Sequence, residues 1–287
     1  MPSAVWPENN SENYIIPLIN EAKVWRRSGY GMYSEMKWSF AMKLFEFPRD
    51  KAEIDQVVSR AEYAALLIPS PRQSYVEEVC AQARQFGFAG VVATPFDCPA
   101  VLKLLEGSGV ETICLNALNH ALDENFDCRM FGIQALLEQG VKHFELGVPC
   151  GLLREGAFDV VHAELAAMVE KIHAAGGKMS VILEPECMSK DAMAKVIAMA
   201  EELGADHVRL CSGFERVCGT NGGRATLNTI CFAREQHTGK IGLKAGGGWD
   251  YAYLEDCAEY MENGASRVDV GPRFVEQLAN LGYRRDA

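Results

Sequence analysis

Asp206-His-Val-Arg-Leu-Cys-Ser-Gly213 and Lys240-Ile-Gly-Leu-Lys-Ala-Gly-Gly-Gly248 are two short apolar segments, each with one cation in its interior. Segments that are apolar on both faces are typical of strands in a buried parallel sheet. A cation inside such a strand, here Arg209 or Lys244, is unfavourable unless it is paired or lines a polar cavity. Two such cations on successive strands therefore predict a polar cavity that binds an anion and a carbonyl group.

The same strand–helix pattern extends outward from these two segments. A Gly-rich loop, Asn221-Gly-Gly-Arg224, and an amphipathic helix over 225–238 connect them. Similar apolar strands are predicted at 64–69, 90–95, 111–117, 143–148, 178–185 and 267–271. Amphipathic or proline-initiated helices are predicted at 74–86, through 101–105, and at 126–139, 157–174, 189–203 and 272–281. Several predicted helices end at a glycine, the residue that most readily adopts the left-handed conformation that terminates a helix. These glycines are Gly140, Gly176, Gly204, Gly239 and Gly264.

Eight strand–helix units at a spacing of about 25 residues favour closure into a (β/α)8 TIM barrel. An open, doubly wound sheet is the alternative. It would carry a Gly-x-Gly-x-x-Gly phosphate motif after its first strand, and Ile68-Pro-Ser-Pro-Arg72 has none. We therefore predict an α/β barrel over 61–287.

The first 60 residues differ from the rest and are interpreted as an N-terminal helical extension. They hold three of the four tryptophans and predicted helices near 12–27 and 51–62, with a further helix over 34–47. The aromatic residues Trp25, Tyr30, Tyr33 and Trp38 are compatible with packing in a homodimer.

The composition limits the classes of function. The chain has 287 residues, of which 48% are apolar and 23% charged, as in a soluble globular protein. Its net charge of −11 argues against nucleic acid or an anionic membrane as partner. Ten cysteines lack a Cys-x-x-Cys pair, and no secretory signal precedes them, which favours reduced thiols in a cytoplasmic protein. We expect no metal ion and no cofactor.

In a TIM barrel, catalytic residues lie at the C-terminal ends of the strands. Glu145, Arg209 and Lys244 are the strongest candidates there, because each is a charge between apolar residues on a buried strand. The other candidates are polar residues at the same ends of strands: Thr94, Asn116, Glu184, Ser212 and Asp269.

Several segments occur in an order that resembles one known family. They are Leu66-Leu-Ile-Pro69, Phe88-Ala-Gly-Val-Val-Ala-Thr-Pro95, Gly204-Ala-Asp-His-Val-Arg-Leu-Cys-Ser-Gly-Phe214, Gly222-Gly-Arg-Ala-Thr226, Ile241-Gly-Leu-Lys-Ala-Gly-Gly-Gly248 and Gly264-Ala-Ser-Arg-Val268. From Leu66 to Gly271 the chain resembles deoxyribose-phosphate aldolase, a class I (Schiff-base) aldolase on a (β/α)8 barrel. The resemblance implies an aldehyde-lyase.

The resemblance also implies roles for individual residues. The family's imine-forming lysine aligns with Arg209, which stays protonated and cannot add to a carbonyl. The second family lysine aligns with Lys244, and the proton-relay aspartate with Glu145. The first-strand lysine and second-strand cysteine match Ile68 and Val92.

The family binds phosphate with serines after the eighth strand, and this stretch holds Asp269 and Arg273 instead. Arg273 would have to offset the repulsion between Asp269 and a phosphate. Glycine amides still offer donors to an anion. The residues expected to bind substrate or phosphate are Ser212, Gly213, Gly222, Gly223, Gly246, Gly247, Gly248, Asp269 and Arg273.

Three functions are compatible with these residues. The first is an aldolase-like lyase for a small phosphorylated sugar or keto acid, with Lys244 as nucleophile, Arg209 lowering the pKa of Lys244, and Glu145 moving protons. The second is an isomerase or decarboxylase that stabilises an enolate without a Schiff base, with Glu145 or Glu184 as base. The third is a non-catalytic barrel that binds a metabolite or serves in an assembly.

Overall fold

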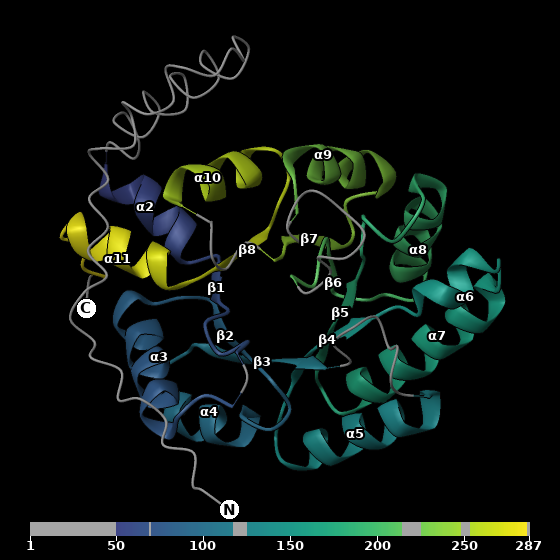
Figure 1. Ribbon diagram of the computed structural model, residues 1–287, viewed down its shortest axis with the longest axis horizontal. Coiled ribbons are helices and arrows are strands. Elements are labelled where there is room, and N and C mark those ends of the chain that lie inside the picture. The colour runs from purple at the N-terminus through teal and green to yellow at the C-terminus, as the bar shows by residue number, and fades with distance from the viewer. Residues whose placement is uncertain (1–49, 69, 117–124, 214–224, 248–252, 286–287) are drawn as a thin grey trace, which may run out of the picture. The chain divides into compact units, whose positions relative to one another are not determined.

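The computed structural model describes residues 50–68, 70–116, 125–213, 225–247 and 253–285. Eight parallel strands pair in chain order and close into a barrel, so the (β/α)8 fold is confirmed. Figure 1 shows the strands at the centre with the helices around them. The strands are β1 Ala61–Tyr63, β2 Gly90–Ala93, β3 Glu111–Asn116, β4 His143–Gly147, β5 Lys178–Ile182, β6 His207–Arg209, β7 Gly242–Ala245 and β8 Arg267–Val270.

Most helices around the strands lie close to where the sequence predicts them. They are α2 Lys51–Val58, α3 Gln73–Phe86, α4 Cys98–Leu105, α5 Phe126–Glu138, α6 Cys150–Arg154, α7 Phe158–Ala174, α8 Lys190–Glu202, α9 Leu227–Gln236, α10 Leu254–Glu262 and α11 Pro272–Asn280. Asn125, Ser189 and Thr226 accept backbone hydrogen bonds as N-caps of α5, α8 and α9. The five glycines predicted as left-handed stops all have positive φ. Helices α6 and α10 were not predicted.

The first strand lies earlier than the sequence pattern predicts. The apolar run 64–69 suggested it, yet β1 spans Ala61–Tyr63 and pairs with β8 through Glu62 and Asp269. Ala64 and Leu67, after the strand, pack inside the barrel in a small apolar cluster. The prediction was wrong because Glu62 interrupts the apolar pattern, although this charged side chain is fully buried.

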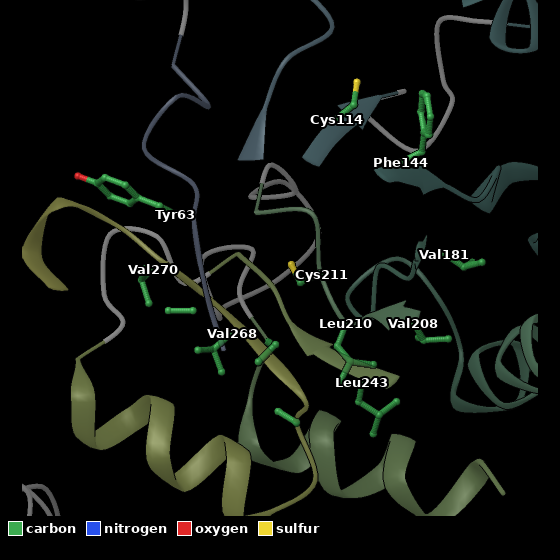
Figure 2. Close-up of a cluster of buried hydrophobic side chains, with 14 of the residues drawn as sticks. Tyr63, Cys114, Phe144, Val181, Val208, Leu210, Cys211, Leu243, Val268 and Val270 are labelled. Atoms are coloured by element: carbon green, nitrogen blue, oxygen red, sulfur yellow. The ribbon is translucent and has the colours of Figure 1, made fainter. Parts of the chain in front are cut away.

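Side chains alternate between the two faces of each strand, and this alternation positions the site. Figure 2 shows Val181, Val208, Leu243 and Val268 on β5, β6, β7 and β8, within the large apolar cluster that also includes residues of the surrounding helices. Successive residues of a strand point to opposite faces. The charged residues that alternate with these apolar ones, such as Arg209 after Val208, therefore face the barrel interior.

Only the end of the predicted N-terminal extension lies in the described part of the chain. Helix α2 confirms the helix predicted near 51–62, and it packs against α10. Tyr283 Oη donates a hydrogen bond of 2.6 Å to Asp55 Oδ1 on α2. The helices predicted at 12–27 and 34–47 lie outside the described residues, and the division at residue 60 stays a prediction. Within the described part, no helix combines the length and hydropathy needed to cross a membrane.

Candidate active site

Five charged side chains meet inside the barrel, each at most 1% exposed. They come from five strands and are Glu62, Glu145, Arg209, Lys244 and Asp269. Strand register brings them together, since Glu62 pairs with Asp269 across β1 and β8, and Arg209 pairs with Lys244 across β6 and β7. The polar cavity predicted from two cations is therefore a cluster of buried ion pairs.

Arg209 bridges two carboxylates with its guanidinium. Nη1 donates to Glu145 Oε2, and Nη2 donates to Asp269 Oδ2. The same side chain donates from Nε to the carbonyl of Cys211 at 2.9 Å and from Nη2 to the carbonyl of Ser212 at 3.4 Å. Burial lowers the pKa of Arg209, but the two carboxylates outweigh it and raise that pKa above its usual value. Arg209 is a permanent cation that fixes Glu145 and Asp269.

Lys244 contacts a different set of groups. Its Nζ lies 2.9 Å from Glu62 Oε1, 3.1 Å from Glu62 Oε2, 2.9 Å from Glu145 Oε1 and 3.1 Å from His143 Nε2. Burial lowers the pKa of Lys244, but Glu145 and Glu62 raise it more, so the net pKa lies above its usual value. The expectation of a lowered pKa for Lys244 was wrong, because Glu145 lies between the two cations and binds both.

The two acids that Arg209 binds have opposite pKa shifts. Burial raises the pKa of Glu145, but Arg209 and Lys244 outweigh it and bring the pKa to about 2. For Asp269, burial with repulsion from Glu145 and Glu62 outweighs Arg209 and raises the pKa to about 7. Its Oδ1 atom is buried and has no hydrogen-bond partner among the described residues. Of these two acids, Asp269 is therefore the one that binds a proton near neutral pH.

A second polar layer lies two residues earlier on the strands. His143 precedes Glu145 by two positions on β4, so both face the interior. Its Nδ1 is 2.8 Å from Glu111 Oε2, and its Nε2 is 3.2 Å from Ser180 Oγ. Sequence reasoning missed this layer and Glu62. The available signal was the alternation itself, since a polar residue two positions before a buried charge shares its face.

Seven of the nine predicted anion-binding residues are serine or glycine, and they divide into three groups. Ser212 and Gly213 follow β6, where Glu184 accepts the Ser212 amide at 2.7 Å and Cys211 Sγ accepts the Gly213 amide at 3.4 Å. Gly246 and Gly247 follow β7, and the Gly247 amide donates to Asp269 Oδ2 at 3.1 Å. The amides of Ser212, Gly213 and Gly247 are therefore engaged within the protein. Gly222, Gly223 and Gly248 lie outside the described residues.

Asp269 and Arg273, which the sequence predicts to act together on a substrate phosphate, have different surroundings, and their role stays a prediction. Asp269 is buried within the barrel and neutralised by Arg209, whereas Arg273 lies exposed on α11. Thr94 donates a 2.8 Å hydrogen bond to Asp97 beside α4, which is the contact of a turn. Within the described ranges, six cysteines form no disulfide: Cys80, Cys98, Cys114, Cys128, Cys231 and Cys257. No group of three or more His, Cys, Asp or Glu side chains in these ranges could hold a metal ion.

A closed (β/α)8 barrel with a buried lysine, arginine and carboxylates on its inner face has the architecture of an enzyme that works at the barrel centre. Comparison with curated proteins points to one family. The chain is 29% identical over 243 residues to deoxyribose-phosphate aldolase from Bacteroides thetaiotaomicron, covering 81% of this chain and 98% of that protein. It is also 29% identical over 218 residues to the enzyme of that name from Clostridium tetani, covering 74% and 94%.

Solved structures agree on the fold. An aldolase named QR15 matches with a TM-score of 0.67 at 18% identity, covering 80% of this chain and 97% of that one. A tetrameric deoxyribose phosphate aldolase from Aeropyrum pernix matches with a TM-score of 0.67 at 20% identity, covering 79% and 92%. No protein-family model matches the chain. The resemblance found in the sequence is thus supported over most of the barrel.

Proposed function

We propose that the protein is an aldolase-like lyase that makes or breaks a carbon–carbon bond in a small phosphorylated sugar or keto acid. Lys244 is the imine-forming residue in this proposal. The observation that carries it is the position of this amine, which is buried at the barrel centre in contact with Glu62, Glu145 and His143. The similarity to deoxyribose-phosphate aldolases supports the reaction type.

The contacts allow a complete Schiff-base cycle. Lys244 first passes one ammonium proton to a neighbouring group, and the free amine adds to the substrate carbonyl. Loss of water from the carbinolamine gives an iminium. The iminium accepts the electrons of the bond between its α- and β-carbons as the β-hydroxyl loses its proton, which gives an aldehyde and an enamine. Glu145, at 2.9 Å from Nζ, moves the protons of the substrate. Arg209 stays protonated and holds the other oxygen of Glu145.

Borohydride trapping tests this proposal. The protein is incubated with acetaldehyde, pyruvate, dihydroxyacetone phosphate or deoxyribose 5-phosphate, reduced, and analysed by peptide mass spectrometry. We expect an adduct on Lys244 with at least one carbonyl compound and none in Lys244→Met. Lys195→Met is the matched control, since Lys195 is half exposed on α8 and pairs with Asp191. Adducts only on exposed lysines, or none at all, would contradict the imine mechanism.

The raised pKa of Lys244 favours a second candidate function. A lysine that stays charged at neutral pH, beside Arg209, would stabilise an enolate without forming a covalent bond. The reaction would then be an isomerisation or decarboxylation. Exchange of a substrate C–H proton in deuterated water, with no trapped adduct on Lys244, would favour this candidate. Loss of that exchange in Lys244→Met would assign it to the same site.

A further inference from the structure

Glu111, His143 and Lys244 form a line of hydrogen bonds from the N-terminal end of the barrel to its centre. Glu111 begins β3, and its side chain is 30% exposed. His143 is 3% exposed and lies between the other two, 2.8 Å from Glu111 and 3.1 Å from Lys244. Substrates of TIM barrels enter at the C-terminal face. This line therefore reaches Lys244 from the side opposite the substrate.

The chemistry of the two outer groups determines which nitrogen of His143 carries the proton. An ammonium has donors and no acceptor, so His143 Nε2 must accept from Lys244. Its Nδ1 then carries the hydrogen and donates to the carboxylate of Glu111. Lys178 Nζ holds the other oxygen of Glu111 at 2.8 Å. Glu111 thus fixes the tautomer in which His143 presents a free electron pair to Lys244.

His143 is surrounded by charged and titratable groups of both signs. Burial and the charge of Lys244 lower its pKa, while Glu111, Glu62 and Glu145 raise it. The His207 ring stacks on it at 5.8 Å between centroids, and the pKa of His207 is itself lowered to about 3 by burial and nearby cations. Two further charged residues, Lys178 and Arg267, pair with Glu111. His143 is therefore a neutral acceptor while Lys244 is charged.

Transfer of the proton from Lys244 to His143 raises the proton affinity of His143. The ammonium charge is one cause of the lowered pKa of His143, and it disappears as soon as the proton moves. The imidazolium that forms has Glu111 at 2.8 Å. Glu145 is a poorer acceptor, because Arg209 binds its second oxygen and keeps its pKa at about 2.

We propose that His143 is the base that takes the ammonium proton of Lys244, and that Glu111 is the positioning residue that fixes the imidazole for this step. The proton moves from Lys244 Nζ to His143 Nε2, which leaves a neutral amine and an imidazolium with no change of total charge. In the cycle this proton returns and leaves with the carbinolamine hydroxyl as water. This catalytic use rests on the proposed function, but the base itself is testable with any small aldehyde.

Reductive methylation of Lys244 with formaldehyde and cyanoborohydride provides the test. With His143 as acceptor, the reactive pair is an isomer of the resting pair, so the wild-type rate should rise by less than tenfold per pH unit wherever this transfer, and not proton loss to solvent, supplies the free amine. His143→Gln still accepts a hydrogen bond but takes no proton. We expect it to be about 100-fold slower at pH 7, the size of a general-base effect. Its rate should rise roughly tenfold per pH unit, because free amine must then come from bulk titration.

Two further variants separate positioning from folding. Glu111→Gln should be at least about tenfold slower at pH 7, because the tautomer is no longer fixed. Ser180→Ala removes the other group near His143 Nε2 and should keep the profile of the wild type. Thermal melts verify that each variant is folded. A His143→Gln profile identical to the wild type would overturn the proposal, as would a Lys244 that is never methylated.

Nitrogen NMR of the wild type with ¹⁵N-labelled histidine tests the tautomer of His143 without measuring the activity of a variant. The His143 resonances, assigned by their loss in His143→Gln, should report Nδ1–H and an unprotonated Nε2 at pH 7. An Nε2–H tautomer would overturn the proposal. If no sugar or keto acid is trapped while methylation keeps its dependence on His143, the proposed function fails and this inference stands.

Discussion

At the scale of single residues, the shape of the guanidinium determines how the site is held together. Arg209 donates to two carboxylates and two backbone carbonyls from one planar group. A lysine ammonium at this position would be a single point and could not span Glu145 and Asp269. The two buried cations are therefore not interchangeable. Arg209 positions acids, whereas Lys244 is the only one of the pair that can become a nucleophile.

Replacing Arg209 should destabilise the fold. Arg209→Met leaves Glu145 and Asp269 buried without their shared partner, and removal of one member of a buried ion pair costs about 3 to 5 kcal/mol. Arg209→Lys keeps the positive charge but loses the forked guanidinium, so its loss of unfolding free energy should be smaller. Urea denaturation at pH 8 measures both. A free energy of unfolding for Arg209→Met within about 1 kcal/mol of the wild type, the value typical of surface ion pairs, would contradict this account.

At the scale of elements, the close approach of β6 and β7 gives Gly246 a specific role. A Cβ atom on Gly246 would lie 2.2 Å from the carbonyl oxygen of Cys211 and 2.6 Å from Arg209 Nε. These two atoms are hydrogen-bonded to each other at 2.9 Å. The absence of a side chain at this position thus allows Arg209 to bond to the backbone at the end of its own strand.

Gly246→Ala should therefore separate the ends of β6 and β7. We expect a loss of about 1 to 3 kcal/mol of unfolding free energy, as for other overpacked sites, together with slower modification of Lys244. Gly151→Ala is the matched control, because Gly151 lies within α6 with no atom near its Cβ position. That variant should be neutral or more stable by about 0.5 to 1 kcal/mol. Equal melting temperatures for the two variants would contradict the proposed close contact.

At the scale of the whole molecule, the buried acids predict how stability changes with pH. The pKa of Glu145 is lowered to about 2, so its contribution is present above pH 4.5 and is lost as pH falls through 2. Glu111 acts in the same direction, because His143 and Lys178 lower its pKa. Asp269 has a pKa raised from 3.8 to about 7, so the folded state binds its proton more tightly. Its contribution is present below pH 3.8 and is lost as pH rises through 7.

Stability should therefore rise from pH 2 to about pH 4.5 and fall between about pH 4 and 7 through Asp269. Urea denaturation over this range measures the profile. Asp269→Asn should lack the fall, while Asp191→Asn, at an exposed site on α8, should keep it. A fall of equal size in Asp269→Asn would show that another group causes it.

The sequence by itself determined the order of eight strands and the burial of Glu145, Arg209 and Lys244. It did so because local alternation and helical spacing are properties of neighbouring residues. The same local reasoning misplaced β1. An acidic residue such as Glu62 is expected to be exposed as long as its buried partner is unknown.

Only the tertiary structure decided which charges meet. Lys244 binds Glu62, which lies 182 positions earlier in the chain, and Arg209 binds Asp269, 60 positions later. These contacts depend on barrel closure between β1 and β8, which no local pattern encodes. The direction of the Lys244 pKa shift follows from them, because a buried amine responds to the charges within a few ångströms and not to its neighbours in sequence.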